Sequence, residues 1–564
     1  MTAERLPAAA ARHAAPMLLA ATGALFGIRA VLALTRSGPI LFADEAGYLG
    51  AARMLAGGMD FAMGSSPFYR PGYALVLVPV ARLEIDPATM YAVVVVVNAM
   101  LAASLVGLLY LLLRRCFDQP PAPALGGAIV GAVYPTVSSI TQIAKSENLL
   151  FPLIVAWLLA FGMLLRARGR RGVVAGLAFG ACGAALWTVH GRMIVALSVT
   201  FVALVALAGM RRIGAAAAAA GLVASSAGFV LARILDARVI AHNYEGRDVD
   251  EVGSALAAID GLGAVASVLR NLAGETWYLL VASFGILGVV VVAAGARTAV
   301  RLRRREAQSA DLSLALLLAT TAGLLVLSAV WFADPTRPDH LIYGRYVEPV
   351  VPPLLALGVS MLATRSLVVP IGRVLAAIAL LTVVVAGLRS GLRFEGEDAN
   401  RWSIASMPFV TSDLQPAVLA GAGVVAAAGT WVLARVSRRA PAALWLVMLA
   451  LFVPVTAYTE VRLILRAERA VYPAGWVSPQ PVVEARGAAV AFDTSHFDNI
   501  AVKVYQWFLP HSRFETFDGA SSRAPSPLVF SGATWPKEHP ERPATAVWRD
   551  PGRDEFLWEL GPER

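Results

Sequence analysis

The sequence predicts a polytopic α-helical membrane protein with a small α/β domain at its C-terminal end. Hydrophobic residues make up 58% of the 564 residues and charged residues only 15%, whereas roughly one quarter of a soluble protein is charged. Thirteen apolar runs are about long enough to cross a membrane. After about residue 460 the chain becomes polar and rich in proline. The net charge of +10 does not indicate nucleic acid, because arginine is concentrated in short loops between apolar runs.

Each apolar run predicts one membrane-spanning helix, so we expect about 13 transmembrane helices. The runs cover residues 17–35, 89–113, 124–143, 148–165, 172–189, 193–210, 213–234, 276–295, 311–332, 347–364, 369–388, 416–434 and 442–460. Two cysteines, Cys116 and Cys182, fall at the end of one run and inside another, so they indicate no disulfide framework.

Arginine in alternate loops predicts how the chain is oriented in a cell membrane. If the N-terminus is cytoplasmic, every short inner loop is basic, as the positive-inside rule requires. These loops include Arg114 and Arg115, Arg166 to Arg171, Arg211 and Arg212, Arg297 to Arg305, and Arg435 to Arg439. The outer side then receives residues 36–88, 235–275, 333–346, 389–415 and the tail from about 461. We therefore predict a membrane domain over residues 1–460 and an extracytoplasmic α/β domain over 461–564.

The first outer segment, residues 36–88, contains the stretch that indicates function. A helix is expected from Phe42 onward, with adjacent carboxylates on Asp44 and Glu45, and Pro71 suits the start of a second helix at the interface. Ionisable residues beside a membrane span are candidate functional residues. The alternative is that Asp44 only caps the helix and Glu45 only complements its dipole.

Four separate segments bring polar side chains to the same predicted membrane depth. They contribute Asp44, Glu45, Tyr48 and Arg70; Lys145, Ser146 and Glu147; His190 and Arg192; and Arg337, His340, Tyr343, Arg345 and Tyr346. Individually, the lysine and arginines are explained by helix ends near the membrane surface, and the tyrosines by an aromatic belt. Together they predict one site at the outer face, because the inner face carries cations and almost no carboxylates.

The motifs in these segments resemble those of the GT-C glycosyltransferases, over roughly residues 17–365. Asp44-Glu45-x-x-Tyr48 after the first span is similar to the first-loop motif of the lipid A aminoarabinose transferases and the protein O-mannosyltransferases. Supporting matches are Tyr69-Arg-Pro-Gly-Tyr73, the Ser146-Glu147 turn and Gly344-Arg-Tyr346. The resemblance implies a GT-C fold and a sugar donor on polyprenyl phosphate. It also implies a role in cell-envelope glycan or glycolipid synthesis, with a glycan, lipid or protein acceptor.

The resemblance also gives the residues their expected roles. Asp44 is the expected general base for the acceptor hydroxyl, with Glu45 as a second catalytic candidate. Arg345, Lys145 and Arg192, in that order, are expected to bind the donor phosphate. Displacement in line would invert the anomeric carbon. The remaining candidates for acceptor or sugar binding are Tyr48, Arg70, Glu147, His190, His340 and Tyr346. The carboxylate oxygens of Glu45 and Glu147 are also of the kind that binds a divalent cation. Such a cation is the one cofactor that the sequence suggests.

Two other classes of protein fit parts of the sequence. A transporter is expected to carry charges near the middle of the bilayer, often on broken helices, whereas Arg29 is the main charge inside these apolar runs. A membrane scaffold whose tail binds a partner would need no shared site. Convergence of Asp44, Lys145, Arg192 and Arg345 on one cavity would favour the enzyme, and scattered positions would favour the scaffold.

Overall fold

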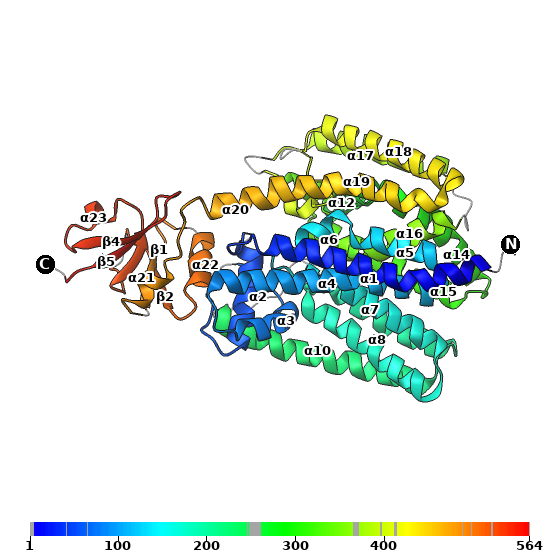
Figure 1. Cartoon of the computed structure of the whole chain (residues 1–564), viewed down its shortest axis with the longest axis horizontal. Helices are drawn as coiled ribbons and strands as arrows, with labels where there is room; N and C mark the ends of the chain where they lie inside the picture. The colour runs from blue at the N-terminus through cyan, green and yellow to red at the C-terminus, as the bar shows by residue number, and fades with distance from the viewer. Residues whose placement is uncertain are drawn as a thin grey trace.

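Long apolar helices lie side by side in one bundle, and a small sheet domain projects from one end of it (Figure 1). The structure is a computed structural model. It describes residues 5–40, 42–64, 66–244, 246, 261–364, 371–394, 398–410, 414–487, 489–497, 499–520 and 523–562. The N-terminus lies at the end of the bundle farthest from the sheet domain. The predicted class, a polytopic helical membrane protein with a small α/β domain, is confirmed.

Within the described residues, ten helices are long and apolar enough to cross a membrane. They are α1 (Arg5–Ala33), α4 (Pro87–Arg115), α7 (Glu147–Arg166), α8 (Gly169–Val189), α9 (Ile194–Gly209) with the short η1 (Gly191–Met193), α10 (Ala215–Asn243), α15 (Ser309–Trp331), α17 (Ile371–Gly391), α18 (Pro416–Arg439), and α19 (Leu444–Thr459), which η6 (Pro441–Ala443) precedes and η7 (Glu460–Ile464) and α20 (Leu465–Val471) continue.

The predicted number of 13 spans is too high by this criterion, because two of the runs do not form one long helix. Residues 124–143 divide into α5 (Pro121–Ala132) and α6 (Pro135–Ile140), since the residue before a proline avoids helical geometry. Arg29 donates to the carbonyl of Ala132 at 2.9 Å, where α5 ends. Residues 347–364 form η4 (Glu348–Val350) and α16 (Val351–Ala363), which together are shorter than a typical span.

An eleventh span is possible if a sharply bent pair of helices crosses as one unit. α12 (Gly261–Ala282) meets α13 (Ile286–Val289), which η2 (Val290–Gly295) and α14 (Ala296–Arg303) continue, at a bend of 106°. Gly285 lies at the bend with φ of +74°, in the left-handed region that glycine adopts without strain. The predicted outer segment, residues 235–275, is too long, because helices extend into it from both sides. Residues 261–275 are helical, α10 extends to Asn243, and residues 247–260 lie outside the described part.

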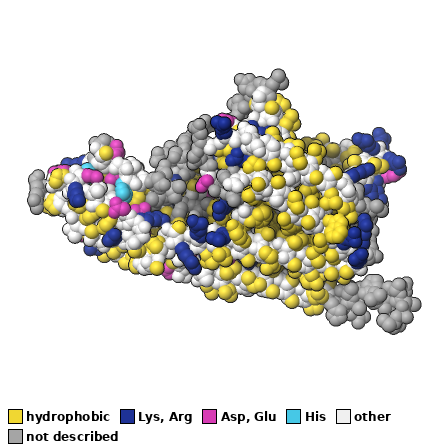
Figure 2. All heavy atoms as spheres, turned by 90° about the horizontal axis from the view of Figure 1, so that it is seen from above, with side chains coloured by type: hydrophobic (Ala, Val, Ile, Leu, Met, Phe, Trp, Pro, Cys, Tyr) yellow, Lys and Arg dark blue, Asp and Glu magenta, His cyan; other side chains and the backbone are white. Residues whose placement is uncertain are grey.

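Exposed side chains divide the surface of the bundle into an apolar band and polar ends. Figure 2 shows apolar side chains over the middle of the bundle, with lysine and arginine gathered at the end opposite the sheet domain and again on the sheet side. Exposed Leu380, Val383 and Val424 belong to the apolar surface. This distribution fits a multi-pass membrane protein, because lipid-facing surface must be apolar.

The segment between α1 and α4 folds at the end of the bundle that carries the sheet domain (Figure 1). It forms α2 (Phe42–Leu55) and α3 (Gly72–Ala81), and α3 begins directly after Pro71, as predicted. Gly72 is required for close approach to the end of α8, because a Cβ atom there would lie 2.6 Å from the carbonyl oxygen of Thr188. The two short helices thus form one wall at this end of the bundle.

The tail carries a five-stranded mixed sheet with strand order β2-β1-β3-β5-β4. Its elements are α21 (Gln480–Glu484), β1 (Ala489–Asp493), α22 (Asn499–Phe508), β2 (Arg513–Phe517), β3 (Leu528–Ser531), α23 (Trp535–Glu538), β4 (Ala544–Arg549) and β5 (Phe556–Leu560). β1 pairs in parallel with β2 and β3, whereas β5 is antiparallel to β3 and β4. The division of domains at residue 460 stays a proposal, and the apolar helix itself continues to Val471.

Candidate active site

Asp44 lies in the first turn of α2 and contacts two cations from distant parts of the chain. Lys145, between α6 and α7, places its Nζ 3.2 Å from Asp44 Oδ2, and Arg345 places Nη1 2.9 Å from the same oxygen. Tyr69 also hydrogen-bonds to this carboxylate. α2 approaches Tyr69 closely because Gly47 leaves room for its ring; a Cβ atom there would lie 2.2 Å from Tyr69 Cδ2.

Arg345 connects Asp44 to a second carboxylate, that of Glu147. Arg345 Nε lies 2.8 Å from Glu147 Oε1, and Arg192 Nη2 lies 3.0 Å from the same oxygen. Glu147 is the first residue of α7, where the positive end of the helix dipole stabilises a carboxylate. We call Lys145, Asp44, Arg345, Glu147 and Arg192 the charge cluster. Asp44, Lys145, Arg192 and Arg345 therefore lie together, which is the arrangement that favours an enzyme over a scaffold.

The backbone around Arg345 explains the Gly-Arg-Tyr motif. The segment lies between η3 (Pro338–Ile342) and η4, and the N–H groups of Gly344 and Arg345 both donate to the carbonyl of Ser403, in η5 (Arg401–Ile404), at 3.1 and 3.0 Å. A Cβ atom on Gly344 would lie 1.9 Å from the Tyr278 ring. Only glycine fits against that ring, so this packing fixes the position of the backbone next to Arg345.

A cavity of about 470 Å³ opens beside the charge cluster. Asp44, Arg192 and Arg345 line it, whereas Lys145 and Glu147 lie behind them and are fully buried. Two nitrogens of the buried Arg192 guanidinium, Nε and Nη1, have no hydrogen-bond partner. The Arg192 side chain is 0% exposed, whereas that of Arg345 is 13% exposed, so Arg345 is the cation that an anionic ligand in the cavity can contact.

The charges in the cluster shift the pKa values of its members. Burial alone would raise the pKa of Asp44, but Arg345 and Lys145 outweigh it, so the pKa lies below its ordinary value and Asp44 is ionised. Burial and the nearby Arg345 charge lower the pKa of Lys145. On the opposite wall, burial lowers the pKa of His340 to about 4, so this histidine is neutral at pH 7.

The other predicted binding residues form the walls of the same cavity, namely Tyr48, Arg70, His190, His340 and Tyr346. The Tyr48 hydroxyl donates to Ser146 Oγ at 2.8 Å, which orients the turn before α7. The Arg70 guanidinium forms an ion pair with Asp236 and stacks 3.3 Å from the Trp187 ring centroid.

Three of these wall residues form an aromatic face together with Phe332. His340 packs against Phe332 with ring centroids 4.4 Å apart, and His190 meets Tyr346 edge-on at 6.0 Å. Arg192 lies 5.2 Å from the centroid of the Tyr346 ring. The wall thus combines aromatic faces with neutral imidazoles.

Glu45 does not belong to the cavity, although it is adjacent to Asp44. It is 0% exposed and accepts hydrogen bonds from the backbone N–H groups of Ile40 and Ala144, both at 2.8 Å, and from the Tyr91 hydroxyl. Successive helical residues point about 100° apart, so Asp44 and Glu45 face different surroundings. These contacts indicate a structural role for Glu45, which fixes the turn before Lys145, and its catalytic role stays a prediction.

Replacing Glu45 with alanine is expected to destabilise the protein strongly. The change leaves three buried donors without an acceptor, each costing about 1–3 kcal/mol. We expect a clear fall in the midpoint of thermal unfolding of the purified protein, whereas alanine at the half-exposed Glu559 should leave it nearly unchanged. An unaltered midpoint for Glu45→Ala would contradict the structural role.

Several residues that complete the site were not predicted from the sequence. Phe332, Trp331 and Asn400 line the cavity, and Asp236 pairs with Arg70. Asp236 was detectable as an acidic residue at the end of an apolar helix. Asn400 has no sequence signal, because it reaches the cavity from an irregular segment between α17 and α18.

The described residues include no group of three or more His, Cys, Asp or Glu side chains that could hold a metal ion. Glu147 Oε1 is occupied by two arginines, and both oxygens of Glu45 accept from protein donors.

Comparison with known proteins identifies the fold. The crystal structure of ArnT from Cupriavidus metallidurans bound to undecaprenyl phosphate matches with a TM-score of 0.52 and 15% identity, over 97% of this chain and 99% of that chain. Arabinosyltransferase EmbB from Mycobacterium smegmatis matches with a TM-score of 0.41 and 15% identity, over 80% of this chain and 42% of that chain. No protein-family model and no curated protein matches the sequence. The likeness to ArnT confirms the predicted GT-C fold.

Proposed function

We propose that this GT-C-fold membrane protein is an inverting glycosyltransferase that moves a sugar from polyprenyl phosphate to an acceptor hydroxyl. The observation that carries the proposal is the convergence of Asp44, Arg345 and Arg192 on one cavity. These residues lie at or between helix ends, not at mid-helix, where a transporter is expected to keep its charges. That the ArnT structure holds undecaprenyl phosphate supports the same class of donor here.

Arg345 and Arg192 have the chemistry that a donor phosphate requires. A guanidinium offers two parallel N–H groups to phosphate oxygens, and the Arg345 side chain lines the cavity and is 13% exposed. Lys145 lies behind Asp44 and adds positive charge without reaching the cavity. In this arrangement Arg345 binds the phosphate directly, and the buried Arg192 and Lys145 contribute through the electrostatic field.

Donor binding also explains how Asp44 becomes a base. Before binding, its carboxylate is occupied by Lys145 and Arg345, which weaken its affinity for a proton. A phosphate competes for Arg345, and Asp44 then loses one of its two cationic partners. Its proton affinity rises only when the donor is in place, which protects the donor from premature reaction.

The reaction follows from this geometry. Asp44 takes the proton of the acceptor hydroxyl while the hydroxyl oxygen attacks the anomeric carbon. The bond from that carbon to the phosphate oxygen breaks, and polyprenyl phosphate leaves with the electron pair. Attack opposite the leaving group inverts the anomeric carbon. Arg345 and Arg192 stabilise the charge that develops on the leaving phosphate.

The charge balance of the site limits the sugar. In the described residues, the cluster and the cavity-lining arginines with their partners comprise five cations (Lys145, Arg192, Arg345, Arg70 and Arg337) and four carboxylates (Asp44, Glu147, Asp236 and Asp339). A phosphodiester donor contributes one negative charge and balances the difference. An amino sugar would add a cation beside carboxylates that already have partners, so we expect a neutral sugar.

A panel of radiolabelled polyprenyl-phosphate sugars, incubated with membranes that carry the protein, tests the function. We expect label to move from a neutral-sugar donor to an acceptor, with at least roughly tenfold lower transfer from an amino-sugar donor of the same lipid, since one unpaired charge costs more than about 1.4 kcal/mol. Consumption of none of the donors would contradict the proposed function. Preference for the amino sugar would contradict the charge argument alone.

The positive-inside pattern supports an extracytoplasmic site and tail. α2, which carries Asp44, and the sheet domain lie at the same end of the bundle, opposite the N-terminus (Figure 1). A reporter that is active only outside the cytoplasm, fused after residue 564, is therefore expected to be active. Activity of a cytoplasmic reporter at the same position, with the exported one inactive, would reverse the orientation.

A further inference from the structure

Two histidines in the wall of the cavity beside the charge cluster each use one ring nitrogen within the protein. His190, between α8 and η1, accepts at Nδ1 from the backbone N–H of Arg192 at 3.3 Å. His340, in η3, accepts at Nδ1 from the backbone N–H of Thr336, also at 3.3 Å. A ring nitrogen that accepts a hydrogen bond carries no proton. These hydrogen bonds therefore assign the proton to Nε2 in both imidazoles, and Nε2 can then only donate.

Both imidazoles remain neutral at pH 7. A second proton would have to go on Nδ1, which already faces a backbone N–H group. Burial and the nearby Arg192 charge lower the pKa of His190 well below its usual range, and Glu147 opposes this shift without reversing it. Burial likewise lowers the pKa of His340, to about 4, against the effect of Asp339. Each ring thus offers one N–H donor and no charge.

The two Nε2–H groups are open to the cavity. Both histidines line it, and within the described residues no hydrogen bond involves either Nε2 atom. Neither atom is among the polar atoms that are fully buried without a partner, whereas Nε of Arg192 and the indole nitrogen of Trp507 are. A ligand in the cavity can therefore accept a hydrogen bond from each ring.

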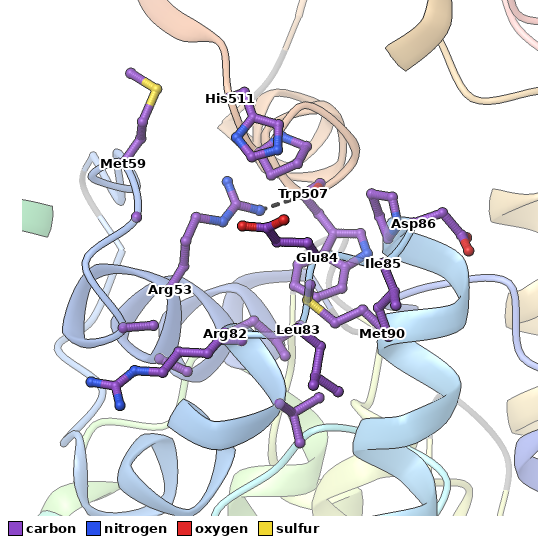
Figure 3. A pocket seen from close by; sticks show the side chains of 18 of the residues that line it. Arg53, Met59, Arg82, Leu83, Glu84, Ile85, Asp86, Met90, Trp507 and His511 are labelled. Atoms are coloured by element: carbon purple, nitrogen blue, oxygen red, sulfur yellow. Dashed lines mark hydrogen bonds between the residues drawn. The ribbon is translucent and has the colours of Figure 1, made fainter.

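Two buried donors of a larger cavity, of about 1280 Å³ between the membrane helices and the tail, are not available in this way. Arg53 donates to the carbonyls of Gln506 and Trp507 at 2.8 and 3.0 Å, and the second of these contacts lies at the edge of that cavity (Figure 3). The Trp507 indole nitrogen is fully buried. These groups hold the tail against α2, whereas the two histidines keep their donors for a ligand.

The positions of the two rings favour the sugar of the donor as that ligand. His190 meets the Tyr346 ring edge-on with centroids 6.0 Å apart, and Tyr346 follows directly after Arg345, the expected contact of the phosphate. His340 lies farther along the same aromatic face, packed against Phe332, whose ring centroid is 5.6 Å from that of Tyr346. A sugar is joined directly to its phosphate, so it lies next to Arg345 and against this face.

We propose that His190 and His340 bind hydroxyl oxygens of the donor sugar through Nε2–H, and so determine which sugars the cavity accepts. The inference rests on the proposed function, since it takes the donor phosphate to lie at Arg345. The acceptor hydroxyl lies instead beside Asp44. A sugar without an oxygen at either place leaves a donor unpaired. A protonated amino group has no acceptor lone pair, so it is also rejected there.

Equilibrium binding without any acceptor tests this subsite. The intact protein in phosphatidylcholine nanodiscs is titrated with a panel of undecaprenyl-phosphate hexoses and pentoses. The reference ligand is undecaprenyl methyl phosphate, a phosphodiester of the same charge without a sugar. We expect the best sugar donor to bind roughly 4- to 100-fold tighter than the methyl ester, because each of two hydrogen bonds contributes about two- to tenfold. Equal affinity for the methyl ester would overturn the proposal.

Deoxy and fluoro analogues of the best donor test the direction of the hydrogen bonds on the unaltered protein. Removal of a hydroxyl that faces a histidine should weaken binding roughly two- to tenfold. Fluorine at the same carbon can accept but cannot donate, so the fluoro analogue should bind more tightly than the deoxy analogue. Fluoro analogues that bind no better than the deoxy analogues at every ring position would show that the sugar does not accept from these rings.

Variants assign the effect to the histidines. His340→Phe keeps a ring against Phe332 and should lower affinity for the sugar donor roughly two- to tenfold, with affinity for the methyl ester unchanged. His340→Gln restores a side-chain N–H and should recover most of the loss, which a merely structural role would not predict. His242→Phe is the matched control, since His242 pairs with Asp60 and does not line this cavity. Full affinity for the sugar donor in both His340→Phe and His190→Phe would contradict the assignment.

Failure of this subsite and failure of the proposed function give different results. The expected binding pattern without any sugar transfer would contradict the function alone. Transfer by a protein that binds the sugar donor and the methyl ester equally would contradict the subsite alone. Thermal unfolding of each variant in the same nanodiscs checks that it is folded, and if His340→Phe fails to fold, the deoxy and fluoro analogues decide on the wild type.

Discussion

Replacing Asp44 with asparagine is expected to lower the rate of sugar transfer roughly 100- to 10,000-fold, the usual cost of losing a general base. Asparagine keeps the shape of the side chain but cannot take the proton of the acceptor. Donor binding should persist or strengthen, because Lys145 and Arg345 then face one carboxylate fewer. The measurement is transfer and donor affinity at matched protein levels.

Stability should change little in this variant. Asparagine accepts a hydrogen bond as aspartate does, and Lys145 can lose its proton, since burial and Arg345 already lower its pKa. Asp60→Asn is the matched control, because Asp60 is 57% exposed and lies outside the cavity beside the charge cluster. Near-normal transfer by Asp44→Asn would show that Asp44 only stabilises the first turn of α2.

Replacing Arg345 with lysine is expected to weaken donor binding roughly 10- to 100-fold, since charge-assisted hydrogen bonds contribute about 1.5–3 kcal/mol each. Lysine keeps the charge but loses the planar fork that contacts Asp44 and Glu147 together. Arg345→Ala should weaken binding further, while the remaining partners, Lys145 for Asp44 and Arg192 for Glu147, preserve the fold. Equilibrium binding of a labelled polyprenyl phosphate to purified protein measures both.

Arg166→Lys provides the control for this series. Arg166 is partly exposed at the end of α7 opposite Glu147 and pairs with Asp118. Donor affinity equal to wild type in both Arg345 variants, with Arg166→Lys also unchanged, would remove Arg345 from the phosphate site.

The membrane bundle could be predicted because the length of each apolar run can be counted from consecutive residues of the sequence. This count gave too many spans where Pro135 divides α5 from α6 and where the proline-rich start of α16 shortens the helix. Strands such as Arg513–Phe517 were also identifiable, since turn residues bound them on both sides.

Convergence of the site could be predicted, but its internal arrangement could not. Asp44, Lys145, Arg192 and Arg345 share one membrane depth, and this places them at the same end of the bundle. The separation of Asp44 from Glu45 depends on the rotation of α2 against Tyr91 and Ala144, which are distant in sequence. The contact between Arg53 of α2 and the carbonyl of Trp507 depends on how the tail docks, and nothing in the sequence near Trp507 indicates α2.

A cryo-electron microscopy structure with a bound polyprenyl phosphate tests the central claim most directly. The proposal predicts the phosphate in the cavity lined by Asp44, Arg192 and Arg345, within hydrogen-bond distance of Arg345, which is turned from Asp44 toward the phosphate. A phosphate bound elsewhere, for example at the arginines of residues 301–305, with Arg345 still paired to Asp44 and Glu147, would contradict it.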